Sequence, residues 1–99
     1  MSILAIGGEF FTEFFSGIGF STYKYRGECK EVLKYIEEAS LTTKVFILSE
    51  KIDAHCLTAI KKFLDERNLT YIILPETDEL DESKIDDYYD RILKSLIGI

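Results

Sequence analysis

The sequence predicts an α/β fold in which helices flank a small parallel sheet of four strands. Three short apolar runs carry this prediction, and a helical pattern follows each of them: ILAIGG (residues 3–8), KVFILSE (44–50) and TYIILPE (70–76). Continuous aliphatic and β-branched runs are typical of parallel strands that are covered on both faces. A weaker extended run, FSTYKY (20–25), lies between the first two. We expect the strand order 2-1-3-4 of receiver-like and Rossmann-like domains, because crossovers between parallel strands are right-handed.

Three segments between these runs have helical periodicity. They span residues 10–15, about Glu28 to Ala39, and about Lys51 to Arg67. Gly17 and Gly19 end the first of them, and we expect the third to stop at Asn68. Residues expected to face the core recur every three or four positions, and they are Phe10, Phe11, Phe14, Phe15, Cys29, Val32, Leu33, Ile36, Ile52, Cys56, Ile60, Phe63 and Leu64.

In chain order the third and fourth runs are residues 44–50 and 70–76, and we expect both to be central strands of the sheet. Their apolar residues should therefore be buried, and these are Val45, Phe46, Ile47, Ile72 and Ile73. Ser49 ends the third run just before a helical pattern. We interpret it as the N-cap of the helix that follows.

The negative charge of the chain is concentrated near its C-terminal end. The net charge is −6, and residues 76–90 hold eight acidic residues and one basic residue. The other residues have 10 acidic and 11 basic side chains, so they are close to neutral. This composition divides the chain into an α/β body (1–75), an acidic linker (76–83) and a C-terminal, mobile-capable helix (84–99).

The C-terminal helix has the most regular apolar pattern in the sequence. Ser83 with Asp86 forms a capping-box arrangement at its start. A continuous apolar stripe follows, formed by Ile85, Tyr88, Tyr89, Ile92, Leu93, Leu96 and Ile97. The stripe must be buried, either against the protein's own sheet or against a partner. Its residues are the candidate partner-binding residues.

Composition also excludes several classes of protein. No basic stripe could neutralise phosphates, so nucleic-acid binding is disfavoured. No apolar run approaches the roughly 20 residues that span a bilayer, and no signal peptide is visible. Cys29 and Cys56 lie in different helical patterns, without a CxxC motif or a cluster of Cys and His. We therefore expect two reduced thiols in a cytoplasmic protein, and neither a disulfide nor a metal site.

The sequence carries no catalytic motif that we can identify. Gly7-Gly8 follows the first strand, but neither GxGxxG nor GK[ST] is present, so we expect no nucleotide cofactor. A phosphate-accepting receiver domain needs Asp at the end of its third strand, where this chain has Leu48-Ser49-Glu50. His55 is the only histidine and lies within a helical pattern. These absences favour a binding module over an enzyme.

The order of several short motifs resembles that of a known family. They are Ile6-Gly7 after the first strand, Phe15 and Gly19 before the second, Phe46-Ile47-Leu48-Ser49-Glu50 in the third, Leu74-Pro75 after the fourth, and Ile97-Gly98-Ile99 at the end. Together with the length of about 100 residues, they resemble the F subunits of the A-type and V-type rotary ATPases. Gly8 and Ser16 depart from this pattern, because the family commonly has Asp and Arg there.

The resemblance implies a non-catalytic subunit of the central stalk, or rotor, of an ATP synthase. Such F subunits bind the coiled-coil D subunits of the stalk and contact the hexamer of A and B subunits through their C-terminal helix. Proton or sodium transport and nucleotide chemistry belong to the partners, and the protein is cytoplasmic and meets the membrane only through the complex. The resemblance leaves open ATP synthesis or hydrolysis, the transported ion, and a docked or extended helix. The alternative is a degenerate receiver-like or phosphotransfer-type signalling domain.

Overall fold

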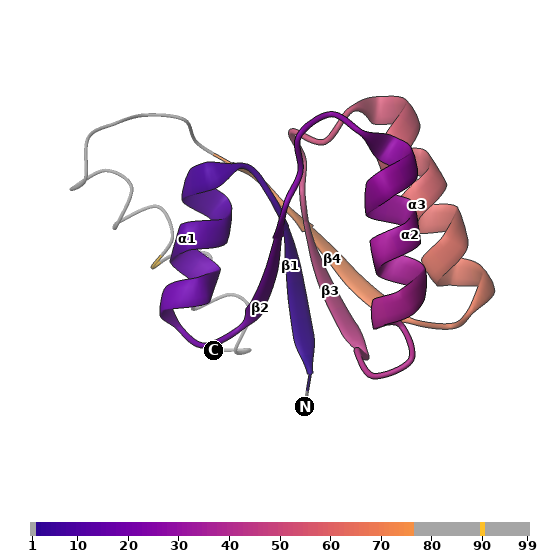
Figure 1. The fold of residues 1–99 in the computed structure, drawn as a ribbon, viewed down its shortest axis with the longest axis horizontal. Helices are drawn as coiled ribbons and strands as arrows, with labels where there is room; N and C mark the ends of the chain where they lie inside the picture. Colours follow the sequence, from indigo (N-terminus) through magenta and orange to yellow (C-terminus); the bar gives the residue numbers. More distant parts are fainter. Residues whose placement is uncertain (1, 77–89, 91–99) are drawn as a thin grey trace.

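The described part of the chain forms a four-stranded sheet and three helices, connected in alternation (Figure 1). The computed structural model describes residues 2–76 and residue 90. The expectations for the linker beyond residue 76 and for the C-terminal helix lie outside these residues. In chain order the elements are β1 (Ile3–Gly7), α1 (Glu9–Gly17), β2 (Ser21–Lys24), α2 (Cys29–Ala39), β3 (Val45–Ser49), α3 (Ala54–Glu66) and β4 (Thr70–Leu74).

All strand pairs are parallel, and the strand order is β2-β1-β3-β4. The register places Leu4 opposite Ser21 on one side and opposite Phe46 on the other. The predicted fold class and strand order are therefore confirmed. All four strands point the same way, so their carboxyl ends share one edge of the sheet.

The helices form two unequal layers. Figure 1 shows α1 on one face of the sheet, with α2 and α3 side by side on the other. Right-handed crossovers produce this division, because the chain moves outward from β1 to β2 and then back across the sheet to β3 and β4. The larger core lies under α2 and α3 and contains Leu4, Ile6, Val32, Ile36, Phe46, Leu48, Ile52, Cys56, Ile60 and Leu64. The smaller core lies under α1 and contains Ala5, Phe11, Phe15 and Ile47.

The expectation that both late strands are central is wrong for β4, which lies at an edge of the sheet. Phe46 and Ile47 in β3 are buried, as predicted, whereas Val45 at the start of the strand is only half-buried. Ile73 in β4 is 37% exposed, and Ile72 is only half-buried. An edge strand has a neighbour on one side alone, so its apolar side chains are covered less completely.

The helix α3 begins at Ala54, three residues later than the sequence predicts, and Asp53 is its N-cap. Residues 50–52 form a turn, in which the Ile52 amide donates a hydrogen bond to the Ser49 carbonyl at 3.2 Å. The Lys51 amide donates to Ser49 Oγ at 3.1 Å. Ser49 therefore caps this turn and not the helix. The predicted stop after α3 is confirmed, because Asn68 has a positive φ of 56°.

The expectation of two reduced thiols is wrong, because Cys29 and Cys56 form a disulfide with a Cα–Cα separation of 5.6 Å. Cys29 is the first residue of α2, and Cys56 is the third residue of α3. Both helices begin at the same edge of the sheet and cover the same face. The fold thus brings together two residues that lie 27 positions apart in the sequence.

Within the described part of the chain, none of the helices has the length and apolarity needed to cross a membrane.

Candidate functional site

The carboxyl edge of the sheet is where open α/β folds place their ligands, and here a side chain of the protein itself occupies it. Glu76 follows β4 directly after Pro75. Its Oε1 accepts a hydrogen bond from the Gly8 amide at 3.1 Å and a second one from the Ser49 hydroxyl. We call these three residues the Glu76 clasp. It ties the end of the fourth strand to the ends of the first and third.

Two glycines make room for this clasp. A Cβ atom on Gly8 would collide with the Glu76 carboxylate. A Cβ atom on Gly7 would meet the Phe11 ring and would lie 2.9 Å from Ser49 Cβ. Close packing of Phe11 and Ser49 therefore requires a glycine at position 7, whereas a side chain at position 8 would have to displace the Glu76 carboxylate.

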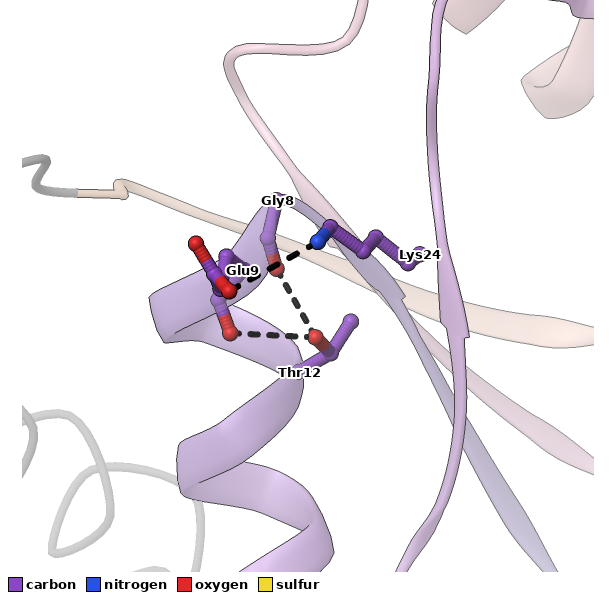
Figure 2. Close-up of polar contacts among 4 residues, drawn as sticks. All are labelled: Gly8, Glu9, Thr12 and Lys24. Atoms are coloured by element: carbon purple, nitrogen blue, oxygen red, sulfur yellow. Dashed lines mark hydrogen bonds and ion pairs between the residues drawn. The ribbon is translucent and has the colours of Figure 1, made fainter.

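The first turn of α1 supports Gly8 from the other side (Figure 2). Thr12 Oγ1 donates to the Gly8 carbonyl at 2.9 Å and lies 3.1 Å from the Glu9 carbonyl. Glu9 also forms an ion pair with Lys24 at the end of β2, with 3.7 Å between Oε1 and Nζ. Both charged side chains are exposed, so water screens the pair and it adds little stability. Thr12 is mostly buried, and we assign the positioning of Gly8 to its hydrogen bonds.

A small hollow of about 170 Å³ lies beside the clasp, lined by Gly7, Gly8, Tyr25, Lys51, Ile52 and Glu76. Tyr25 closes one side of it, because its hydroxyl donates to Asp53 Oδ2 at 2.8 Å. Burial and the neighbouring Asp53 carboxylate raise the pKa of Tyr25 to about 12. Tyr25 therefore keeps its proton, and donates to Asp53, into the alkaline range where an ordinary tyrosine ionises. The hollow is much smaller than the 300–1,000 Å³ of typical small-molecule pockets.

At the carboxyl edge of the sheet, the polar groups of the clasp bond to one another and form a structural contact. The N-terminus of α1 would attract an anion in a nucleotide-binding α/β fold, and here the Glu76 carboxylate takes that position. At the end of β3, where a receiver domain would have its acceptor Asp, Ser49 is fully buried and donates to Glu76. Among residues 2–76, no group of three or more Asp, Glu, His or Cys side chains could hold a metal ion.

The face of the sheet under α1 is the second part of the candidate site, and we call it the aromatic face. Phe11 and Phe15 are fully buried in it, with their ring centroids 4.9 Å apart. Phe20 stacks on Phe15 at 5.9 Å. Half-buried apolar residues surround them, namely Ile3, Phe14, Phe20 and Leu74. Leu74 lies two residues before Glu76, so the described body ends beside this face.

The predicted partner-binding residues are not among those that the structure describes. They are Ile85, Tyr88, Tyr89, Ile92, Leu93, Leu96 and Ile97. Sequence reasoning also missed the Glu76 clasp, because Glu76 was grouped with the acidic linker by composition. The only available signal was the coincidence of Gly7-Gly8, Ser49 and Pro75-Glu76 at the ends of three predicted strands.

Comparisons with known proteins found no match: no protein-family model, no curated protein and no solved structure matches the chain significantly.

Proposed function

We propose that this chain is a central-stalk subunit of a rotary ATPase of the A or V type, equivalent to the F subunits of that family. It has no catalytic role of its own in this proposal. It binds the coiled-coil subunit of the stalk, acts in the cytoplasm at the membrane-bound complex, and regulates rotation through its C-terminal segment. The motif order along the chain supports the proposal, and so does the four-stranded sheet with three helices.

One observation carries the regulatory part of the proposal, namely the place where the body ends. The Glu76 clasp fixes the chain on Gly8 at the start of α1. The acidic linker therefore begins beside the aromatic face, which α1, a helix of nine residues, covers in the described structure. The apolar stripe between Ile85 and Ile97 can then be exchanged between this face and the catalytic hexamer. A differential of a few kcal/mol between two such surfaces decides which one is occupied.

The partner assignment is tested by co-expression with the coiled-coil stalk subunit from an A-type or V-type complex. We expect a stable 1:1 pair in size-exclusion chromatography and in a pull-down through a tag on the coiled-coil subunit. A coiled coil without relation to rotary motors, of equal length and charge, serves as the control and should not bind. Absence of a complex with the stalk coiled coil, or equal binding to the control, would refute the stalk assignment.

The regulatory role is tested by truncation after Glu76, which retains the clasp. The shortened chain should fold, because all seven described elements precede the cut. In a reconstituted motor it should bind the coiled-coil stalk subunit and change the ATPase rate relative to the full chain. Ile92→Ser with Leu96→Ser should reproduce this change, whereas Lys94→Ser, outside the stripe, should leave the rate unaltered. Unaltered rates with the truncated chain would show that the C-terminal segment has no regulatory role.

The alternative, a degenerate receiver-like or phosphotransfer-type domain, shares the strand order of the sheet. The structure disfavours this alternative at the position of the acceptor Asp. Ser49 stands there, and it is buried and donates a hydrogen bond to Glu76. Phosphorylation of the chain by acetyl phosphate, detected as a mass increase, would favour this alternative over the stalk subunit.

A further inference from the structure

The disulfide between Cys29 and Cys56 joins the first turns of two neighbouring helices. Backbone amides in the first turn of a helix have no partner within the helix, and the helix dipole places partial positive charge there. A thiolate formed at either position is therefore stabilised by its own helix, as in thiol–disulfide exchange proteins. This stabilisation acts with least opposition at Cys29, because burial in apolar surroundings disfavours a charged sulfur at Cys56.

The two ends of the bond differ in their access to solvent. Cys56 is fully buried in the larger core, whereas Cys29 is half-buried and lies at the margin of that core. Thiol–disulfide exchange needs an attacking sulfur in line with the bond, and access therefore selects the sulfur that is attacked. In the described structure, a thiol from solvent can therefore approach the Cys29 sulfur but not the Cys56 sulfur.

We propose that Cys29–Cys56 is a reversible redox site and that a low-molecular-weight thiol of the glutathione type enters it at Cys29. The thiolate of the small molecule attacks Cys29 Sγ, forming a mixed disulfide there while Cys56 leaves as a thiolate and is protonated. A second small thiolate then attacks the sulfur that the first small molecule contributed to the mixed disulfide. This step releases the Cys29 thiolate, which also takes a proton. Two electrons pass to the protein, and two small thiols become one small-molecule disulfide.

The surroundings of the bond allow the reduced state to remain folded. Val32 and Ile36 of α2 and Ile60 and Leu64 of α3 are buried in the same core as the sheet residues, and we expect this packing to hold both helices in place after reduction. The Tyr25 hydroxyl still reaches Asp53 at the start of α3, 2.8 Å away, and so links the segment before α2 to α3. Reduction thus releases a link between two packed helices, and the reduced protein should differ from the oxidised one mainly in stability.

The compartment adds an argument that rests on the function proposed above. Disulfides in cytosolic proteins are usually transient, catalytic or redox-sensing, because glutathione and thioredoxin keep thiols reduced. A stalk subunit in the cytoplasm with such a bond would sense this redox state. The experiment below uses the isolated chain without its stalk partner, so its outcome is independent of the stalk assignment.

The full-length protein is equilibrated in native buffer with graded ratios of reduced to oxidised glutathione, and open thiols are then alkylated at low pH. Tryptic fragments 27–30 and 52–61 separate the two cysteines for mass spectrometry. We expect the dithiol and the disulfide to interconvert within this series, with the glutathione adduct on fragment 27–30. A bond that stays oxidised in native buffer but opens in urea would refute the proposal, as would an adduct on fragment 52–61.

Single variants test the asymmetry directly. Cys56→Ser retains the accessible thiol and Cys29→Ser retains the buried one, and the two chains otherwise differ little. We expect oxidised glutathione to modify the Cys56→Ser protein at least tenfold faster, and we expect equal rates for both in urea. Equal rates in native buffer, with both variants folded by circular dichroism, would overturn the assignment of Cys29. If either variant is unfolded, the adduct mapping in the natural sequence decides the question.

The structural consequence is measured by thermal unfolding. Opening a bond that closes 27 residues should lower the Tm of the natural sequence by more than about 10 °C. The Cys29→Ser/Cys56→Ser protein should unfold at the Tm of the reduced form, and reductant should not change it. An unchanged Tm on complete reduction would contradict the role of the bond as a link between the helices.

Discussion

The two faces of the sheet differ in the size of the apolar core that their helices bury. On one face, α2 and α3 bury a continuous apolar core, and a disulfide joins their first turns. On the other, α1 alone among the described helices buries a smaller core, which half-buried apolar side chains surround. Leu74 packs against this second core, and Glu76, two residues later, is bonded to Gly8 at the start of α1. The difference shows that one sheet can carry a large, cross-linked core on one face and a smaller core with half-buried margins on the other.

The largest expected effect comes from the well-packed face. Phe46→Ala removes a fully buried ring under α2 and α3 and should cost about 3–5 kcal/mol, through lost transfer free energy and the cavity left behind. At the margin of the aromatic face, Phe14→Ala should cost about half as much or less, because Phe14 is only half-buried. Urea denaturation followed by circular dichroism measures both. Equal costs would remove the contrast between the faces.

Gly7→Ala tests how tightly the carboxyl edge is packed beside α1. The added methyl group must displace the Phe11 ring or Ser49, so we expect a loss of about 1–3 kcal/mol in the free energy of unfolding. Gly17→Ala is the control, because no heavy atom lies within 4 Å of its added Cβ and the position is helical. That change should be neutral or stabilising by up to about 1 kcal/mol. A neutral Gly7→Ala protein would mean that this edge is loosely packed.

Glu76→Ala tests the clasp between the sheet edge and the linker. The Ser49 hydroxyl and the Gly8 amide lose their acceptor, and we expect a cost of about 1–3 kcal/mol. Glu76→Gln should cost less, because its amide oxygen can still accept one of these hydrogen bonds. Glu50→Ala removes an exposed carboxylate from the neighbouring turn and should change the stability by less than about 0.5 kcal/mol. If all three changes have the same effect, the clasp is not an anchor.

The smallest expected effect concerns the pH dependence of the edge beside α3. The pKa of Tyr25 is raised to about 12 from an ordinary value of 10.0, so its neutral form is favoured by folding. Its contribution to stability is complete below about pH 10 and is lost as the pH rises toward 12. Tyr25→Phe should flatten the decline of the urea midpoint across this alkaline range. Some slope should remain, because burial also raises the pKa of Tyr23 and Tyr71. A slope identical to that of the natural sequence would contradict the link between Tyr25 and Asp53.

The order of strands and helices could be read from the sequence because each signal is local. Apolar runs such as residues 44–50 and the spacing of Val32 and Ile36 specify a strand and a helix face within a few residues. Right-handed crossovers then leave one simple topology. The prediction failed at β4 because exposure depends on the number of neighbouring strands. Ile73 has the same residue type and local pattern as a central residue, but the strand order puts it at an edge.

The sequence by itself determined the elements, the strand order and the division between a nearly neutral body and an acidic segment, because periodicity and composition act over short distances. Only the tertiary structure decided which distant side chains meet. Cys29 meets Cys56 because two helices start side by side on one face of the sheet. Glu76 meets Gly8 across 68 positions because parallel strands end at the same edge. These contacts depend on how the elements pack in three dimensions, and no local pattern in the chain encodes that arrangement.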